Sequence, residues 1–123
     1  MIAATDRLRG LRILVVEDEG PVAMLIEDML EEMGCTVAGS AASVGEALEL
    51  IGRGGFDFAL LDVNLAGEKV DPAAELLMRR GVPFAFATGY GAGGISQELR
   101  DRPVVQKPFS APELAALVRR ALG

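Results

Sequence analysis

The sequence predicts a doubly wound α/β domain, in which helices cover both faces of a five-stranded parallel sheet. Two observations lead to this fold class: short apolar runs alternate with helical patterns, and the apolar runs show no inside–outside alternation. Strands that are apolar on both sides are buried on both sides, which is typical of parallel sheets between helices. Right-handed crossovers then distribute the helices over the two faces.

Five short apolar runs are the expected strands. The first spans residues 13–16, is rich in β-branched residues and ends in three consecutive acids. Runs of this length and composition, bounded by turn residues or acids, favour strands over helices. The other four runs cover residues 36–38, 58–61, 83–87 and 104–105.

Five helices are expected to connect and follow these strands. From Pro21 the apolar residues recur with a helical period, which predicts one buried face. That face consists of Val22, Leu25, Ile26, Met29, Leu30 and Met33. A second apolar stripe follows residue 43, and a weaker helical stretch covers residues 95–99.

Sequence signals mark three helix starts. Ser43 with Glu46 and Ser110 with Glu113 have the spacing of a capping box, in which side chain and backbone donors are satisfied reciprocally. Asp71-Pro72 fits an N-cap followed by proline in the first helical position.

Length, charge and composition narrow the function. The chain has 123 residues, a net charge of −6, no His and one Cys. These counts exclude a Ser-His-Asp triad, a His-ligated zinc and an internal disulfide. An acidic chain is a poor non-specific binder of nucleic acid, and no apolar run is long enough for a membrane helix. We expect a single cytoplasmic domain over residues 1–123, with residues 1–10 as an N-terminal extension.

Polar side chains end four of the five expected strands. In a doubly wound sheet the carboxyl ends of the strands share one edge, so these side chains are expected to gather there. They are Glu17, Asp18, Asp62, Thr88 and Lys107. Asp57 begins its strand and is therefore expected at the opposite edge.

The chemistry of this set indicates phosphoryl transfer. Three neighbouring carboxylates repel one another unless a cation neutralises them, and an all-oxygen donor set favours Mg²⁺, with Mn²⁺ as a substitute. Lys107 supplies a positive charge for a phosphoryl oxygen, and the Thr88 hydroxyl can donate to another. A carboxylate such as Asp62 can act as the nucleophile and form an aspartyl phosphate.

Four motifs resemble the receiver domain of two-component response regulators over essentially the whole chain. They are Val15-Val16-Glu17-Asp18-Glu19, Leu60-Leu61-Asp62-Val63-Asn64, Ala87-Thr88-Gly89 and Lys107-Pro108-Phe109. The resemblance implies a flavodoxin-like (βα)5 receiver fold. It also implies a phosphorylation switch rather than an enzyme, with only self-catalysed phosphotransfer and autodephosphorylation.

The same resemblance assigns roles to individual residues. Asp62 would be the phosphoacceptor, and Thr88 and Lys107 the switch hydroxyl and the phosphate-binding lysine. Mg²⁺ would be held by Glu17, Asp18, Asp62 and the main-chain carbonyl of Asn64. The Lys107–Pro108 peptide would be cis. The phosphoryl donor would be a sensor histidine kinase or a histidine phosphotransfer protein, and the signal would pass to a further protein partner.

Three departures from the family pattern stand out. Val104 occupies the position where the family commonly has an aromatic residue, three before the lysine. Tyr90 follows a Phe-Ala-Thr-Gly motif and resembles a subgroup of single-domain receivers, although it comes one residue earlier than in that subgroup. Residues 65–68 lack the Met-Pro that many receivers carry.

These departures suggest two roles for Tyr90, beside the simpler reading that it packs on the surface. Tyr90 could be the switch residue on a glycine-rich hinge. Together with Asn64 it could also flank the line of water attack and set the lifetime of the phosphoryl group.

Several other functions compete with a phosphorylation switch. A small Mg²⁺-dependent phosphohydrolase would use the same aspartyl phosphate, but it needs a general acid where Asn64 stands. A flavodoxin-like cofactor binder would need a phosphate-binding loop where the acids 17–19 stand. A receiver that is never phosphorylated, or a piece of a longer regulator, would have the same sequence pattern.

Overall fold

The computed structural model describes residues 8–89, 95–99 and 101–123. The strands are β1 (Arg12–Val16), β2 (Thr36–Ala41), β3 (Phe58–Asp62), β4 (Asn64–Leu65), β5 (Glu68–Lys69), β6 (Phe84–Thr88) and β7 (Val104–Gln106). The helices are α1 (Gly20–Glu32), α2 (Val44–Arg53), α3 (Asp71–Arg80) and α4 (Ala111–Leu122), with a 3₁₀ turn, η3 (Gln97–Leu99).

Five of the strands form one parallel sheet in the order β2-β1-β3-β6-β7, which confirms the predicted fold class. The chain runs outward from β1 to β2, then crosses to β3 and continues to β6 and β7. The direction of winding therefore changes between β1 and β3, the place where doubly wound sheets open a crevice at their carboxyl edge.

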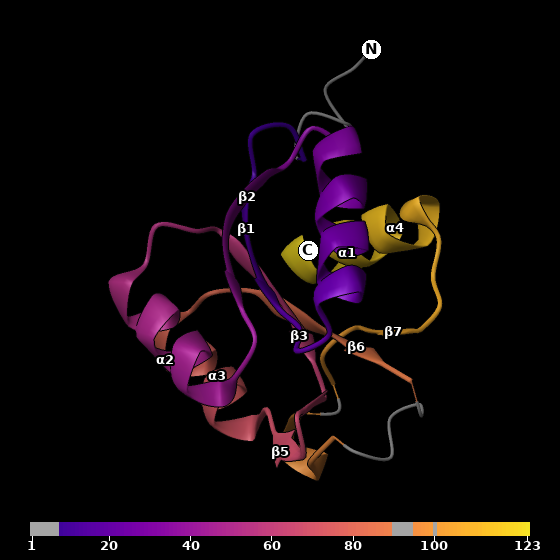
Figure 1. Cartoon of the computed structure of the whole chain (residues 1–123). Helices are drawn as coiled ribbons and strands as arrows, with labels where there is room; N and C mark the ends of the chain where they lie inside the picture. The colour runs from indigo at the N-terminus through magenta and orange to yellow at the C-terminus, as the bar shows by residue number, and fades with distance from the viewer. Residues whose placement is uncertain (1–7, 90–94, 100) are drawn as a thin grey trace.

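The helices cover the two faces of this sheet in pairs (Figure 1). Side chains of α1 and α4 pack with the core residues Ile13, Val15 and Leu60 on one face. Side chains of α2 and α3 pack with Leu14, Leu61 and Phe86 on the other face. Alternate residues of each strand thus enter opposite cores, which is why the central strands are apolar throughout.

The central strands are buried as their sequences predict, whereas β2 lies at the edge of the sheet. Every residue of β3 and β6 is buried. In β2 exposed residues alternate with half-buried ones up to buried Ala41. Because the second half of the strand contains Gly39 and Ser40, the apolar run in the sequence located only the first half.

Two expectations about the helices are wrong. Where the sequence predicts a fourth helix, around residues 95–99, the structure has the short 3₁₀ turn η3. Ile95 and Leu99 in this segment are buried. On α1, Leu25 is 56% exposed and Ala23 is buried instead. The other five predicted residues do face the core: Ile26 and Leu30 are buried, and Val22, Met29 and Met33 are partly buried against the same cluster.

The three predicted helix starts agree with the structure to different degrees. Ser110 and Glu113 form the full capping box of α4. Ser43 accepts from the Glu46 N–H, but the Glu46 carboxylate accepts from the Ala42 N–H rather than from that of Ser43. At α3 the N-cap is Val70, one residue before the predicted Asp71, so Asp71 contributes its charge within the first turn.

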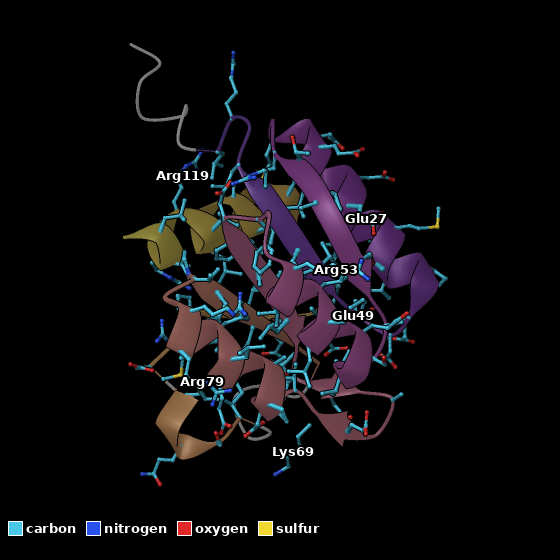
Figure 2. The ribbon with its side chains drawn as sticks, turned by 90° about the vertical axis from the view of Figure 1, so that its left-hand side faces the viewer. Glu27, Glu49, Arg53, Lys69, Arg79 and Arg119 are labelled. Carbon is cyan, nitrogen blue, oxygen red and sulfur yellow. The ribbon has the colours of Figure 1, made fainter. Side chains whose placement is uncertain are left out.

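Charged side chains stand out from the surface, as Glu49 and Arg53 do on α2 (Figure 2). Their charged atoms lie 3.7 Å apart one helical turn along, and both side chains are about two-thirds exposed, so the pair adds little stability. Among the described residues, no helix is both long and apolar enough to cross a membrane.

Candidate phosphoryl-transfer site

The five polar side chains that end the strands do meet at the carboxyl edge of the sheet. Glu17 and Asp18 follow β1, Asp62 is the last residue of β3, Thr88 ends β6, and Lys107 follows β7. Parallel pairing of β1 with β3, of β3 with β6 and of β6 with β7 brings these ends together. A hollow of about 490 Å³ opens there, lined by all of them except the buried Glu17.

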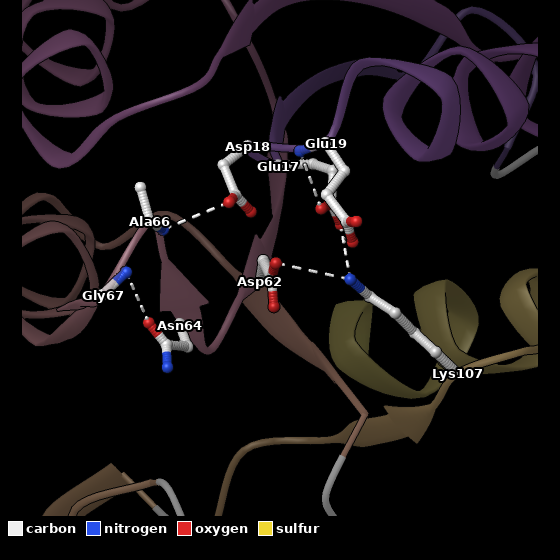
Figure 3. A network of polar contacts seen from close by, with 8 residues as sticks. All are labelled: Glu17, Asp18, Glu19, Asp62, Asn64, Ala66, Gly67 and Lys107. Atoms are coloured by element: carbon white, nitrogen blue, oxygen red, sulfur yellow. Dashed lines mark hydrogen bonds and ion pairs between the residues drawn. The ribbon is translucent and has the colours of Figure 1, made fainter.

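Lys107 is the centre of the polar contacts in this site (Figure 3). Its Nζ donates to Glu17 Oε1 at 2.6 Å and lies 3.3 Å from Asp62 Oδ2. The Glu17 side chain is 1% exposed and that of Lys107 19% exposed, so the pair is shielded from solvent. Strand β7 directly precedes Lys107 and fixes its backbone, and the Lys107 N–H donates to the Thr88 carbonyl. The Lys107–Pro108 peptide is cis.

The environment favours the protonated form of Asp62. Burial and then the charge of Glu17 raise its pKa from 3.8 to about 6, against the opposing effect of Lys107. Burial lowers the pKa of Lys107, but its hydrogen bond to Glu17 and the two carboxylate charges outweigh burial, so the pKa is raised. Lys107 therefore stays charged, while one positive charge faces three carboxylates.

The acids present a set of oxygen atoms suited to a hard cation. One carboxylate oxygen from each of Glu17, Asp18 and Asp62 lies within 4.8 Å of the others. Such a donor set, without nitrogen or sulfur, fits Mg²⁺ or Mn²⁺ rather than zinc. A divalent cation would also offset the repulsion that Lys107 alone leaves between Asp62 and its neighbours.

Asp18 and Asn64 are both tied to the short antiparallel hairpin formed by β4 and β5, which the sequence analysis missed. Asp18 Oδ2 accepts from the Ala66 N–H at 3.2 Å, and Asn64 Oδ1 accepts from the Gly67 N–H at 3.1 Å. Ala66 and Gly67 line the hollow. The sequence signal was weak, because Ala-Gly is a less typical hairpin turn than Asn-Gly.

The other predicted residues lie in three places: in the site, in the sheet, and outside the described residues. Thr88 is buried and lines the hollow. Val104 pairs with Phe86 in the sheet and is partly buried against one core. Tyr90 lies outside the described residues, so both of its expected roles stay predictions.

Asp57 lies at the other edge of the sheet, as expected from its position before β3. It accepts hydrogen bonds from the Arg12 backbone and guanidinium at 2.9–3.2 Å. These bonds lower the pKa of Asp57, the direction opposite to that of Asp62. Two aspartates five residues apart thus differ in chemistry because they lie at opposite ends of one strand.

The doubly wound sheet, with acids and a lysine at its carboxyl edge, is the arrangement of a receiver domain, and comparison with known proteins agrees. The family model of the response regulator receiver domain matches residues 13–119. The chain belongs to this family, as its motifs implied.

Two solved structures illustrate the similarity. SdrG from Sphingomonas melonis Fr1 is 44% identical with a TM-score of 0.84, over 93% of this chain and 98% of that one. The receiver domain of PhyR from Erythrobacter litoralis is 30% identical with a TM-score of 0.79, over 94% and 92% of the two chains.

Curated relatives are longer proteins. The chain is 30% identical to the phyllosphere-induced regulator PhyR of Methylorubrum extorquens, over 89% of this chain and 43% of that protein. It is 34% identical to the transcriptional regulatory protein TcrA of Mycobacterium tuberculosis, over 94% and 47%. The chain thus spans less than half the length of these relatives. The phosphohydrolase alternative finds no support among these matches.

Proposed function

We infer that this receiver domain accepts a phosphoryl group on Asp62 in a Mg²⁺-dependent reaction and signals through contacts with other proteins. The observation that carries this inference is the position of Asp62. Its carboxylate lies at the hollow, within 3.3 Å of the Lys107 ammonium and beside two further acids. A nucleophilic carboxylate, a fixed cation and a metal-binding set are the parts that phosphoryl transfer requires.

The reaction moves one phosphoryl group between two atoms. A carboxylate oxygen of Asp62 forms a bond to phosphorus, while the bond from phosphorus to the donor nitrogen of a phosphohistidine breaks and the imidazole retains that electron pair. Lys107 would turn its ammonium toward a phosphoryl oxygen, and the Thr88 hydroxyl would donate to another. Glu17, Asp18, Asp62 and the Asn64 carbonyl would hold Mg²⁺, which supplies positive charge to the phosphoryl oxygens.

The partners and location follow from the family and remain proposals. The donor would be a sensor histidine kinase or a histidine phosphotransfer protein in the cytoplasm. The chain itself would catalyse only its own phosphorylation and dephosphorylation. The receiver unit would extend over the whole chain, with residues 1–10 as an extension.

Incubation with acetyl phosphate tests the phosphoacceptor directly. With Mg²⁺, we expect intact-protein mass spectrometry to show one phosphoryl group per chain, and with a chelator none. Asp62→Asn should reduce labelling at least a hundredfold, because an amide is not a nucleophile of comparable strength. Asp57→Asn is the matched control at the other edge of the sheet and should be labelled normally. Undiminished labelling of Asp62→Asn would contradict the proposal, and steady turnover of acetyl phosphate without stoichiometric labelling of the chain would favour a hydrolase.

We also propose that Tyr90 responds to phosphorylation and shields the phosphoryl group. It is the sole Tyr of the chain, so its ring resonances are easily assigned. We expect them to shift when beryllofluoride, a phosphoryl mimic, is added with Mg²⁺. Tyr90→Ala should shorten the half-life of the phosphorylated protein severalfold, and Tyr90→Phe should not. Unchanged resonances exclude the switch, and an unchanged half-life excludes the shielding.

A further inference from the structure

The hairpin β4–β5 is built to hold its tip against the acidic site. Asn64 pairs with Lys69 and Leu65 with Glu68, which leaves Ala66 and Gly67 as a two-residue turn. Both have positive φ, 51° and 88°, as a type I′ turn requires. Among the described residues, Ala66 is the one non-glycine with a positive φ, an unfavourable conformation that the surroundings must impose.

The base of the hairpin is fixed by the core. Leu65 and Val70 are almost fully buried and belong to the same apolar cluster as Val63. The Val70 N–H donates to the Val63 carbonyl at 3.2 Å and closes the base. The tip is exposed, and in Figure 2 the Lys69 side chain points away from the protein. The position of the tip therefore depends on its own polar contacts.

Two hydrogen bonds hold the tip, one within the hairpin and one to the site (Figure 3). The Asn64 side chain accepts from the Gly67 N–H and so braces the turn from within. The braced turn directs the Ala66 N–H to Asp18 Oδ2. That bond uses one oxygen of Asp18 and orients the carboxylate toward Glu17 and Asp62, with which it forms the oxygen cluster.

We propose that the Asn64 side chain is a positioning residue for the metal site: by bracing the hairpin it holds the Ala66 N–H on Asp18 and keeps that carboxylate oriented for a divalent cation. This role is separate from the ligand expected of the Asn64 main-chain carbonyl, because truncating the side chain leaves the carbonyl in place. The proposal rests on the metal site of the proposed function and assigns one of its determinants. Groups that orient metal-binding carboxylates through hydrogen bonds commonly control affinity in this way.

Asn64→Ala tests the proposal by two readouts. In the metal-free protein we expect the Ala66 amide proton to shift upfield and to exchange faster with solvent, since its bond to Asp18 is no longer held. The Kd for Mg²⁺, from a titration of amide resonances, should rise roughly 3- to 10-fold, somewhat less than the roughly 10- to 100-fold that direct partners of metal ligands contribute, because Asn64 acts on Asp18 through the hairpin turn.

Two variants serve as controls. Asn64→Asp retains an acceptor for the Gly67 N–H and should keep the Ala66 amide as in the wild type. Lys69→Ala changes an exposed side chain of the same hairpin and should leave both readouts unchanged. An Asn64→Ala protein with either an unmoved Ala66 amide or an unchanged Kd overturns the proposal. Mg²⁺ binding with no labelling by acetyl phosphate would instead overturn the phosphoacceptor and leave the role of Asn64 standing.

Discussion

Replacing Lys107 with Met is expected to destabilise the metal-free protein by about 3–5 kcal/mol, the usual cost of leaving a buried charge without its partner. Lys107 Nζ is 2.6 Å from an oxygen of Glu17, whose side chain is 1% exposed. Without the ammonium, Glu17 and Asp62 repel each other in a poorly solvated site. Urea denaturation at neutral pH in the presence of a chelator measures the loss.

A double-mutant cycle separates this charge effect from lost packing. Glu17→Gln in the Lys107→Met background should recover most of the stability, because the buried carboxylate is then gone. Arg12→Met breaks an ion pair whose partners are half exposed, and it should change stability little. If Lys107→Met is as stable as the wild type, or if the double variant is no better than the single one, the lysine does not neutralise the buried acid.

The residues of the site could be predicted because they depend on strand ends. Apolar runs locate β1, β3 and β6 closely, since both faces of these strands are buried. Once the sheet is parallel, its carboxyl edge follows, and with it the grouping of Asp18, Asp62 and Lys107. The same argument separated Asp62 from Asp57, which the structure places at opposite ends of β3 with opposite pKa shifts.

The pairing within the site could not be predicted in the same way. Lys107 and Glu17 are 90 positions apart, and their 2.6 Å contact depends on side-chain directions that a strand boundary does not specify. The hairpin was missed because its strands have two residues each, too short for a period-2 pattern.

Leu25 was assigned to the core because a helical stripe has no sharp border, and only the approach of α1 to the sheet decides which side chains are covered.

Asp62→Asn is expected to stabilise the metal-free protein by about 1–3 kcal/mol at pH 7.5, although it removes the proposed phosphoacceptor. The folded protein raises the pKa of Asp62 from 3.8 to about 6, so it favours the protonated form. Ionisation therefore costs stability. The cost is absent below the ordinary pKa, grows as the pH rises through the interval between the two values, and is complete above about 6. Asn carries no charge, so the Asp62→Asn protein does not bear this cost of ionisation.

The dependence on pH and metal distinguishes this origin from improved packing. The advantage of Asp62→Asn over the wild type, measured by urea denaturation, should fade as the pH is lowered toward 4 and should shrink when Mg²⁺ is added, because a cation offsets the same repulsion. Asp57→Asn should behave in the opposite sense. Its carboxylate is stabilised by hydrogen bonds from the Arg12 side chain and backbone at a half-exposed position, so this variant should be slightly less stable than the wild type at neutral pH and approach it in acid. A stabilisation of Asp62→Asn that is the same at every pH would show that charge repulsion in the site is not its cause. A loss of stability at pH 7.5 would show that Lys107 already overcompensates the acids around it.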